Sequence, residues 1–387
     1  MSEKLKNSPQ FDAFFNPHAI KWGQGGETSL FLGERPALHD GIHISFKAGR
    51  EAFHRQVENR WVADEFNHED SRLQFLRCPD KISLPTLINL GYQWESDSRA
   101  NRAMFGIYGP VVSNSQMWEG VCEIANMELM HSLTYAEIVR TCIPRPEDVF
   151  NLVMKSEKIL SRSKVVAKVF SKASELVHLL ELERTGKYPW VKVDRGELYD
   201  TLLLTVFAFY FFERVQFMSS FAATFAVVDA GWFQSIGTAV QKIMQDEYYI
   251  HAEFGLSIIK FEMATARGKD SFSRQKPLIA QMLAEIEEGE RSFNAYLLSE
   301  GRTLPGTPLK ALDEYTRLNA YVAADETGIL PLLGWSAVKH HPLPYMNDWL
   351  KVDSFQRARQ EMDDNSYLTN VIDNDVGENT ILLPFNF

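Results

Sequence analysis

Two carboxylate–histidine pairs in the sequence have the spacing of metal ligands. Glu128 and His131 are three residues apart, and Glu247 and His251 are four residues apart. Side chains at these spacings lie on one face of an α-helix, so each pair could bind one metal ion. A single pair arises by chance on many solvated helices, but the segment around Glu128 is largely apolar. We therefore expect that pair to face a helical core.

Two further acids would complete a dinuclear site. In a four-helix bundle, such a site takes one acid from each of two helices and a carboxylate–histidine pair from each of the other two. Glu213 lies in the most apolar segment of the chain, where an unpaired charge is costly and metal coordination would remove the cost. For the fourth helix, spacing alone leaves both Glu95 and Asp97 open. Oxygen and imidazole ligands suit iron or manganese.

Long segments with apolar residues at three- and four-residue spacing predict the helices that would position these ligands. Strand signals are scarce, so we expect an all-α fold. We also expect an irregular segment over 1–45, one helical domain over 46–352 and a flexible acidic tail over 353–387. The predicted helices cover residues 47–60, 85–107, 114–141, 146–184, 196–227, 232–267, 271–300 and 306–328.

Charge and composition exclude several classes of partner. The net charge of −11 argues against direct nucleic-acid binding, which depends on clustered Lys and Arg. Three cysteines without C-x-x-C spacing fit a reducing cytoplasm. Residues 202–228 approach the length of a membrane span, but Glu213 and Arg214 interrupt them. We expect a buried helix there, and a cytoplasmic protein with no membrane partner.

From about Trp61 to its C-terminus, the sequence resembles the small subunit of class I ribonucleotide reductase. The most specific motif is Glu128-x-x-His131-x-x-x-Tyr135, in which the family places a radical-bearing tyrosine four residues after the histidine. The resemblance implies a ferritin-like helical bundle with two iron ions, manganese being possible, and it selects Asp97 over Glu95. The implied metal ligands are Asp97, Glu128, His131, Glu213, Glu247 and His251.

The resemblance also implies roles for residues outside the metal site. Tyr135 would carry the radical. An apolar pocket would surround it, and a transfer route would carry the radical out to the large subunit, which binds the C-terminal tail. The pocket residues would be Phe217, Phe221 and Ile243, and the transfer residues Trp61, Asp246 and Tyr367.

The implied protein is a homodimeric small subunit of ribonucleoside-diphosphate reductase, an enzyme that is active only with its large subunit. A ferritin-like di-iron oxidase or iron-handling protein is the alternative, and it would have no use for Tyr367 or for the apolar end of the tail at 382–387. A metal-free helical scaffold is a third possibility, in which each histidine is a hydrogen-bonded core residue.

The second pair departs from the family pattern. Glu247-x-x-x-His251 is one residue longer than the family's Glu-x-x-His, and Ile250 stands where the histidine is expected. The residues after His251 realign with the family. We therefore expect a one-residue insertion between the two ligands. A π-bulge would absorb the extra residue, and even a regular helix would leave positions four apart only about 40° out of line.

Overall fold

The computed structural model describes residues 29–33 and 38–351 of the chain. Within these residues the chain is helical, and its β-structure is limited to one isolated bridge between Phe31 and Val112. One compact unit spans Met1–Leu350, and a second, short unit spans Lys351–Phe387. Tyr367, the apolar end at 382–387 and most of the irregular segment over 1–45 lie outside the described residues.

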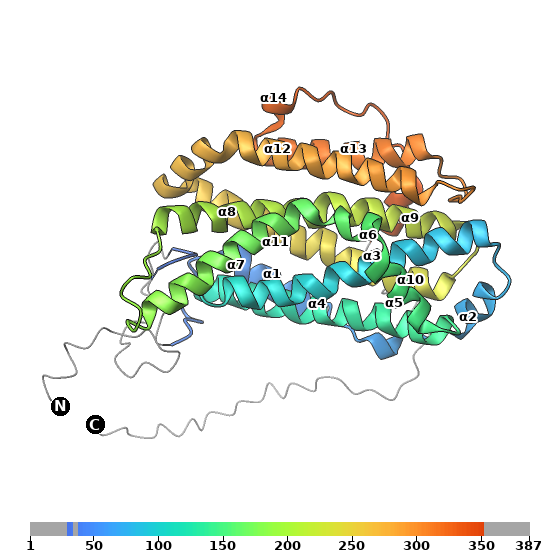
Figure 1. Cartoon of the computed structure of the whole chain (residues 1–387), viewed down its shortest axis with the longest axis horizontal. Helices are drawn as coiled ribbons and strands as arrows, with labels where there is room; N and C mark the ends of the chain where they lie inside the picture. The colour runs from blue at the N-terminus through green and yellow to red at the C-terminus, as the bar shows by residue number, and fades with distance from the viewer. Residues whose placement is uncertain (1–28, 34–37, 352–387) are drawn as a thin grey trace, which may run out of the picture. The chain divides into compact units, whose positions relative to one another are not determined.

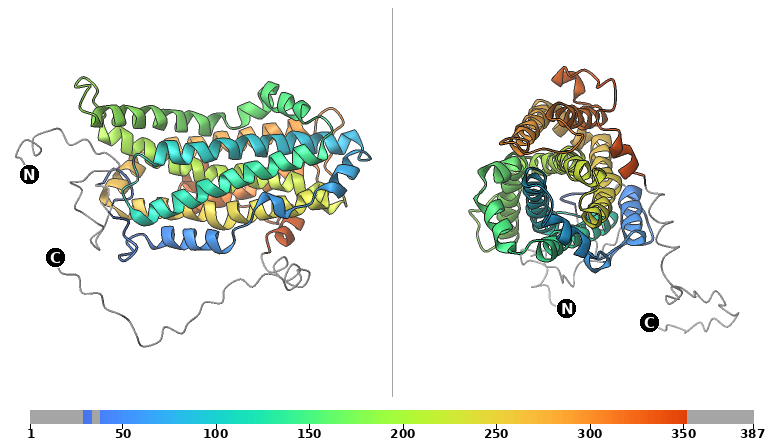
Figure 2. Two further views of the ribbon diagram at one scale, coloured as in Figure 1. Left: turned by 90° about the horizontal axis from the view of Figure 1, so that it is seen from below. Right: turned by 90° about the vertical axis from the view of Figure 1, so that its right-hand side faces the viewer.

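Four long helical segments run along one axis and form the bundle that carries the candidate site (Figures 1 and 2). Two of them are single helices, and each of the other two is a pair of α-helices joined by a π-helical turn. They are α3 (Asp80–Ala103), α4 (Ser115–Cys142), α8 (Arg195–Phe211) with η4 (Phe212–Phe217) and α9 (Met218–Asp229), and α10 (Gln234–Asp246) with η5 (Glu247–His251) and α11 (Ala252–Ala264).

Further helices cover the outside of this bundle. The α12–α13 pair packs along α8 and α9, and α1 packs on α4. The remaining elements are α1 (Lys47–Glu58), η2 (Ala63–Glu65), α2 (Glu69–Phe75), η3 (Met104–Tyr108), α5 (Pro146–Lys155), α6 (Glu157–Arg162), α7 (Lys164–Arg184), α12 (Ala266–Leu297), α13 (Leu309–Glu326), α14 (Leu330–Leu333) and α15 (Tyr345–Trp349).

Two predicted helix boundaries are wrong for reasons of local capping. The single helix expected over 146–184 is three helices. The Ser156 side chain accepts from the Ile159 amide and starts α6 anew, whereas the second break, at Ser163, has no side-chain cap. The gap expected between 267 and 271 is absent. Instead the chain breaks at Thr265, whose extended backbone ends α11 and whose hydroxyl accepts from the Gly268 amide at the start of α12.

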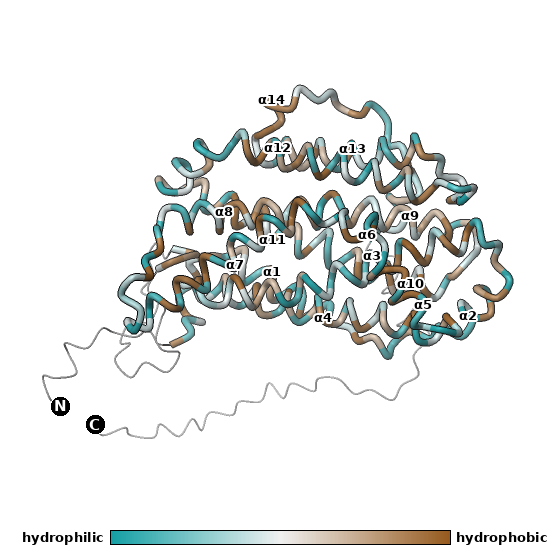
Figure 3. Tube along the Cα trace, viewed as in Figure 1, coloured by the Kyte–Doolittle hydropathy of each residue, from teal (hydrophilic) through white to brown (hydrophobic). Residues whose placement is uncertain are grey.

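The most apolar segment, Arg195–Asp229, is the central core helix of the bundle (Figure 3). By length and composition it could cross a membrane, but 89% of its most apolar window is buried inside the structure. The prediction of a buried helix is therefore confirmed. Asp194 caps its start by accepting from the amides of Gly196 and Glu197, and Glu213 lies near its middle.

Two apolar clusters fill the bundle, and the acid–histidine residues lie where the clusters meet. On α4, Ile124 and Ala125 belong to the first cluster, whereas Met127 and Tyr135 belong to the second. On the α10–α11 segment, the second cluster takes Ile243 and the first takes Ile250. The polar groups of the site are thus enclosed by apolar packing on both sides.

Candidate metal centre

The structure brings the six expected ligand residues together in the middle of the bundle. Their side chains are all 0% exposed. They form two overlapping groups, and within each group the ligand atoms lie within 4.8 Å of one another. One group holds Asp97, Glu128, His131 and Glu247, and the other holds Glu128, Glu213, Glu247 and His251. Because Glu128 and Glu247 belong to both groups, the arrangement fits two neighbouring metal ions that would share these acids as ligand residues.

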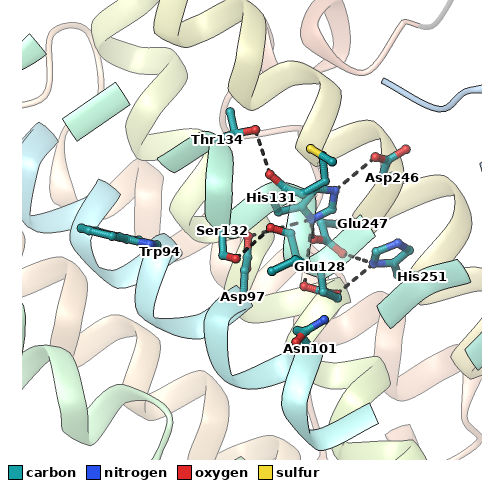
Figure 4. A network of polar contacts seen from close by, with 12 residues as sticks. Trp94, Asp97, Asn101, Glu128, His131, Ser132, Thr134, Asp246, Glu247 and His251 are labelled. Atoms are coloured by element: carbon teal, nitrogen blue, oxygen red, sulfur yellow. Dashed lines mark hydrogen bonds and ion pairs between the residues drawn. The ribbon is translucent and has the colours of Figure 1, made fainter. Parts of the chain in front are cut away.

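Glu247 lies at the centre of the cluster, between the two histidines (Figure 4). Its Oε1 is 2.9 Å from His131 Nδ1, and its Oε2 is 2.6 Å from His251 Nδ1. Glu128 Oε1 is 3.1 Å from the same His251 nitrogen. Asp97 approaches from α3, whereas Glu95 forms an ion pair with Arg99 and belongs to neither group.

The extra residue between Glu247 and His251 is accommodated by a π-bulge and not by a regular helix. A π-helical turn, η5, spans Glu247–His251 and turns both side chains into the cluster. A second π-helical turn, η4, carries Glu213 and was not predicted from the sequence. Such turns often lie at functional sites, because they re-aim side chains within a helix.

Without metal, the cluster holds more buried carboxyl groups than its histidines can neutralise. Burial, and then the charges of neighbouring acids, raises the pKa of both Asp97 and Glu213 well above the usual range. Burial also acts on Glu247, but His251 and His131 outweigh it and lower the pKa of that carboxyl. None of the four oxygens of Asp97 and Glu213 meets a hydrogen-bond donor among the described residues. Coordination to metal ions would satisfy these groups, so the residues fit a dinuclear metal centre.

A chain of contacts leads from His131 away from the cluster. His131 Nε2 is 3.1 Å from Asp246 Oδ2, which also accepts a hydrogen bond from Trp61 Nε1 at 2.8 Å. The rings of Trp61 and His131 are stacked, with their centroids 5.6 Å apart. The structure thus joins three of the residues singled out from the sequence.

His251 has a corresponding partner that the sequence did not reveal. Its Nε2 is 3.2 Å from the side-chain oxygen of Gln56, a buried residue of α1. A neutral glutamine in a helix preceding the bundle carries no charge or spacing signal that would mark it. Only the packing of α1 near η5 shows that it belongs to the site.

Tyr135 is fully buried, and its hydroxyl has no hydrogen-bond partner among the described residues. Burial, and then the charges of Asp97 and its neighbouring acids, raises its pKa well above the usual value. The three expected pocket residues, Phe217, Phe221 and Ile243, are also fully buried and belong to the same apolar cluster as Tyr135. The surroundings of Tyr135 therefore exclude water.

Comparison with known sequences identifies relatives over most of the chain. Residues 43–332 match the family model of the ribonucleotide reductase small chain. The ribonucleoside-diphosphate reductase subunit beta of Buchnera aphidicola subsp. Baizongia pistaciae is 23% identical over 90% of this chain and 93% of its own length. The ribonucleoside-diphosphate reductase 1 subunit beta of Salmonella typhimurium is 24% identical over 83% of this chain and 86% of its own length.

Solved structures share the fold. The ribonucleotide reductase R2 subunit from Clostridium botulinum aligns with a TM-score of 0.71 and 16% identity, covering 86% of this chain and 98% of that one. The dimanganese(II)-NrdF of Streptococcus sanguinis aligns with a TM-score of 0.60 and 14% identity, covering 78% and 95%. These structural matches confirm the expected ferritin-like helical fold. The sequence matches favour a reductase subunit over a separate oxidase. The chain belongs to the ribonucleotide reductase small-chain family.

Proposed function

We propose that this chain is the radical-generating subunit of an aerobic ribonucleoside-diphosphate reductase. Tyr135 would hold the radical, and the large subunit would use it to reduce ribonucleotides to deoxyribonucleotides. Two metal ions would be held by Asp97, Glu128, His131, Glu213, Glu247 and His251. We propose that these ions are iron, although manganese suits the same oxygen and nitrogen donors equally well. When bound and oxidised by O2, the ions would supply the oxidising power that removes an electron from Tyr135.

The observation that carries this proposal is the contact chain from His131 through Asp246 to Trp61. Asp246 would fix the orientation of His131 and hold the Trp61 N–H, so that electron and proton can move between neighbouring groups over short distances. An oxidase that keeps its oxidising equivalent at the metal site has no need for such a chain. The fully buried Tyr135 suits storage, because water and reductants cannot reach it.

We propose that Tyr367 in the tail continues the route to the large subunit. Two hydrogen bonds hold the last residues of the helical unit. The Tyr249 hydroxyl of η5 donates to the Leu350 carbonyl at 2.7 Å, and Gln241 donates to the Trp349 carbonyl at 2.8 Å. From Leu350, the chain to Tyr367 could extend up to roughly 55 Å, at about 3.3 Å per residue. A chain of that length would be long enough to reach a partner protein.

We propose that the subunit forms a homodimer through the outer face of α4. Leu129 and Leu133, four residues apart on this face, are 46% and 48% exposed. Phe105 of η3 is exposed as well, and its ring contacts that of Trp118 on α4. Adjacent exposed apolar side chains of this size mark an interaction surface.

We also propose a cytoplasmic location. The three cysteines form no disulfide, which supports this proposal.

The test is metal analysis with electron paramagnetic resonance after metal and O2 are added to the metal-free protein. We expect two ions per chain and a sharp organic radical signal that disappears in Tyr135→Phe. Tyr92→Phe is the matched control, because Tyr92 is also fully buried and its hydroxyl also lacks a hydrogen-bond partner among the described residues. A loaded site that gives no radical under any activation would refute the proposal.

Removing the tail after Asp364 separates the two roles proposed for this chain. The truncated subunit should form the Tyr135 radical normally but should fail to support nucleotide reduction with the large subunit. Loss of the radical itself would contradict the assignment of Tyr135 and Tyr367 to separate steps.

A further inference from the structure

A buried ion pair lies outside the metal-ligand set and has no part in the radical route. Arg162, at the end of α6, and Glu290, on α12, have side chains that are 1% and 0% exposed. Arg162 Nε donates to Glu290 Oε1 at 2.7 Å, and its Nη2 donates to Oε2. A buried pair of this kind seldom adds net stability, because desolvating both charges offsets their attraction. Its contacts suggest another purpose.

The pair forms hydrogen bonds with Gln216 of the π-helical turn η4. Arg162 Nη2 donates to the Gln216 carbonyl at 3.2 Å. In return, the Gln216 amide donates to Glu290 Oε1 at 3.1 Å and to the Arg162 carbonyl at 3.0 Å. A π-helical turn interrupts the regular helical ladder, so the backbone within it depends on other partners. Here the Arg162 guanidinium supplies a partner for the Gln216 carbonyl.

The guanidinium of Arg162 also connects η4 to other helices of the bundle. It lies against two aromatic rings that also contact each other, 3.7 Å from the ring centre of Tyr92 and 4.1 Å from that of Phe293. Tyr92 belongs to α3, the helix that carries Asp97. A flat guanidinium can stack on rings and donate in its own plane at once, which a lysine cannot do.

Glu213, three residues before Gln216, depends on its backbone for its position. Neither of its carboxylate oxygens meets a hydrogen-bond donor among the described residues. Its neighbour Arg214 fastens the other side of the turn, since Nη1 donates to Asn319 at 3.2 Å and the guanidinium lies 4.4 Å from the Tyr248 ring centre. The position of the Glu213 carboxylate in the cluster therefore depends on the contacts that Gln216 and Arg214 make on the two sides of η4.

We propose that Arg162, Glu290 and Gln216 form a clamp, the η4 clamp, that positions Glu213 for metal binding. The clamp would set the affinity of the ion bound by Glu128, Glu213, Glu247 and His251, and would leave the other ion largely unaffected. These are positioning residues, since none of them belongs to the metal-ligand groups. The inference rests on the dinuclear centre proposed above.

The test replaces the pair by apolar side chains of similar size, in the double variant Arg162→Met with Glu290→Leu. Such replacements of buried pairs often leave folding intact. Metal-free protein is titrated with Mn²⁺, and bound ions are counted by equilibrium dialysis. We expect the wild type to bind two ions, and the variant to bind one normally and the other about 10- to 100-fold more weakly. The absorption spectrum of bound Co²⁺, which reports ligand geometry, should change as well.

A second variant and a control make the outcome decisive. Gln216→Leu leaves the ion pair in place and removes the side-chain hydrogen bonds that link it to η4. This variant should weaken the binding of the same ion, and it decides the question if the double variant does not fold. Arg50→Met with Glu119→Leu removes an ion pair between α1 and α4 that does not contact η4, and should bind both ions normally. Folded clamp variants with wild-type affinities and an unchanged Co²⁺ spectrum would overturn the clamp. A wild type that binds no ion would instead refute the metal centre.

Discussion

The role of Gln56 can be tested by removing one hydrogen bond. Gln56 Oε1 lies 3.2 Å from His251 Nε2, and both side chains are fully buried. In Gln56→Leu, the histidine N–H would lose its acceptor in a site that water does not reach, at a cost of about 1–3 kcal/mol. Part of this is offset, because the Gln56 Nε2 atom has no hydrogen-bond partner among the described residues and leaves with the substitution. A net loss of about 1–2 kcal/mol corresponds to roughly 5- to 30-fold in affinity.

Titration of metal-free protein with Mn²⁺, with free Mn²⁺ measured by electron paramagnetic resonance, would detect this loss in one of the two ions. Gln241→Leu provides a matched control. Gln241 is also a buried glutamine with one unpartnered side-chain atom, but it donates to the Trp349 carbonyl and contacts no expected ligand. The reasoning fails if Gln56→Leu binds both ions as the wild type does, or if Gln241→Leu weakens binding equally.

Three further changes test the dimer, the electrostatics and the transfer route. Leu129→Glu with Leu133→Glu should convert the dimer to a monomer in light scattering, because like charges would meet across a symmetric interface; a dimer that persists places the interface elsewhere. In the metal-free protein, burial opposes the charge on His131, but Glu247 and Asp246 outweigh it and raise its pKa from 6.5 to about 9. Its stabilisation is therefore fully present below pH 6.5 and is lost as pH rises through 9, and the slope of unfolding free energy against pH over this window should flatten in His131→Gln. Asp246→Asn should keep the Tyr135 radical but lower turnover with the large subunit roughly 10- to 100-fold, and unchanged turnover would remove Asp246 from the route.

The fold was largely predictable because long amphipathic segments dominate the sequence. The errors fall where a single polar side chain redirects the backbone. Ser156 and Thr265 each cap a new helix within a continuous apolar pattern, and a hydroxyl at one position changes that pattern too little to be noticed. The short helices α2, α14 and α15 were missed, since they are too brief for a periodic signal.

Within the site, charged residues were predictable and neutral ones were not. Buried acids and histidines are unusual enough to be noticed in an apolar segment, as Glu213 shows. Spacing could not choose between Glu95 and Asp97, because the choice depends on which one Arg99 neutralises in three dimensions. Gln56 and Gln216 carry no charge and lie on helices whose approach to the cluster is decided by packing. The π-helical turn at Glu247 was predictable only because one residue too many separates it from His251.

The two histidines differ in the hydrogen-bond partners of their outer nitrogens, so the two sides of the centre are not alike. The outer nitrogen of His131 faces the carboxylate of Asp246, whereas that of His251 faces the neutral amide of Gln56. An imidazole that is hydrogen-bonded to a carboxylate donates electrons to a metal ion more strongly than one that is hydrogen-bonded to an amide. Two ions bound as proposed would therefore not be equivalent. Only the first contact continues outward, since Asp246 also binds Trp61, while Gln56 Nε2 meets no further partner among the described residues. Once both ions are loaded, Gln56→Leu should therefore spare radical transfer, and Asp246→Asn should not.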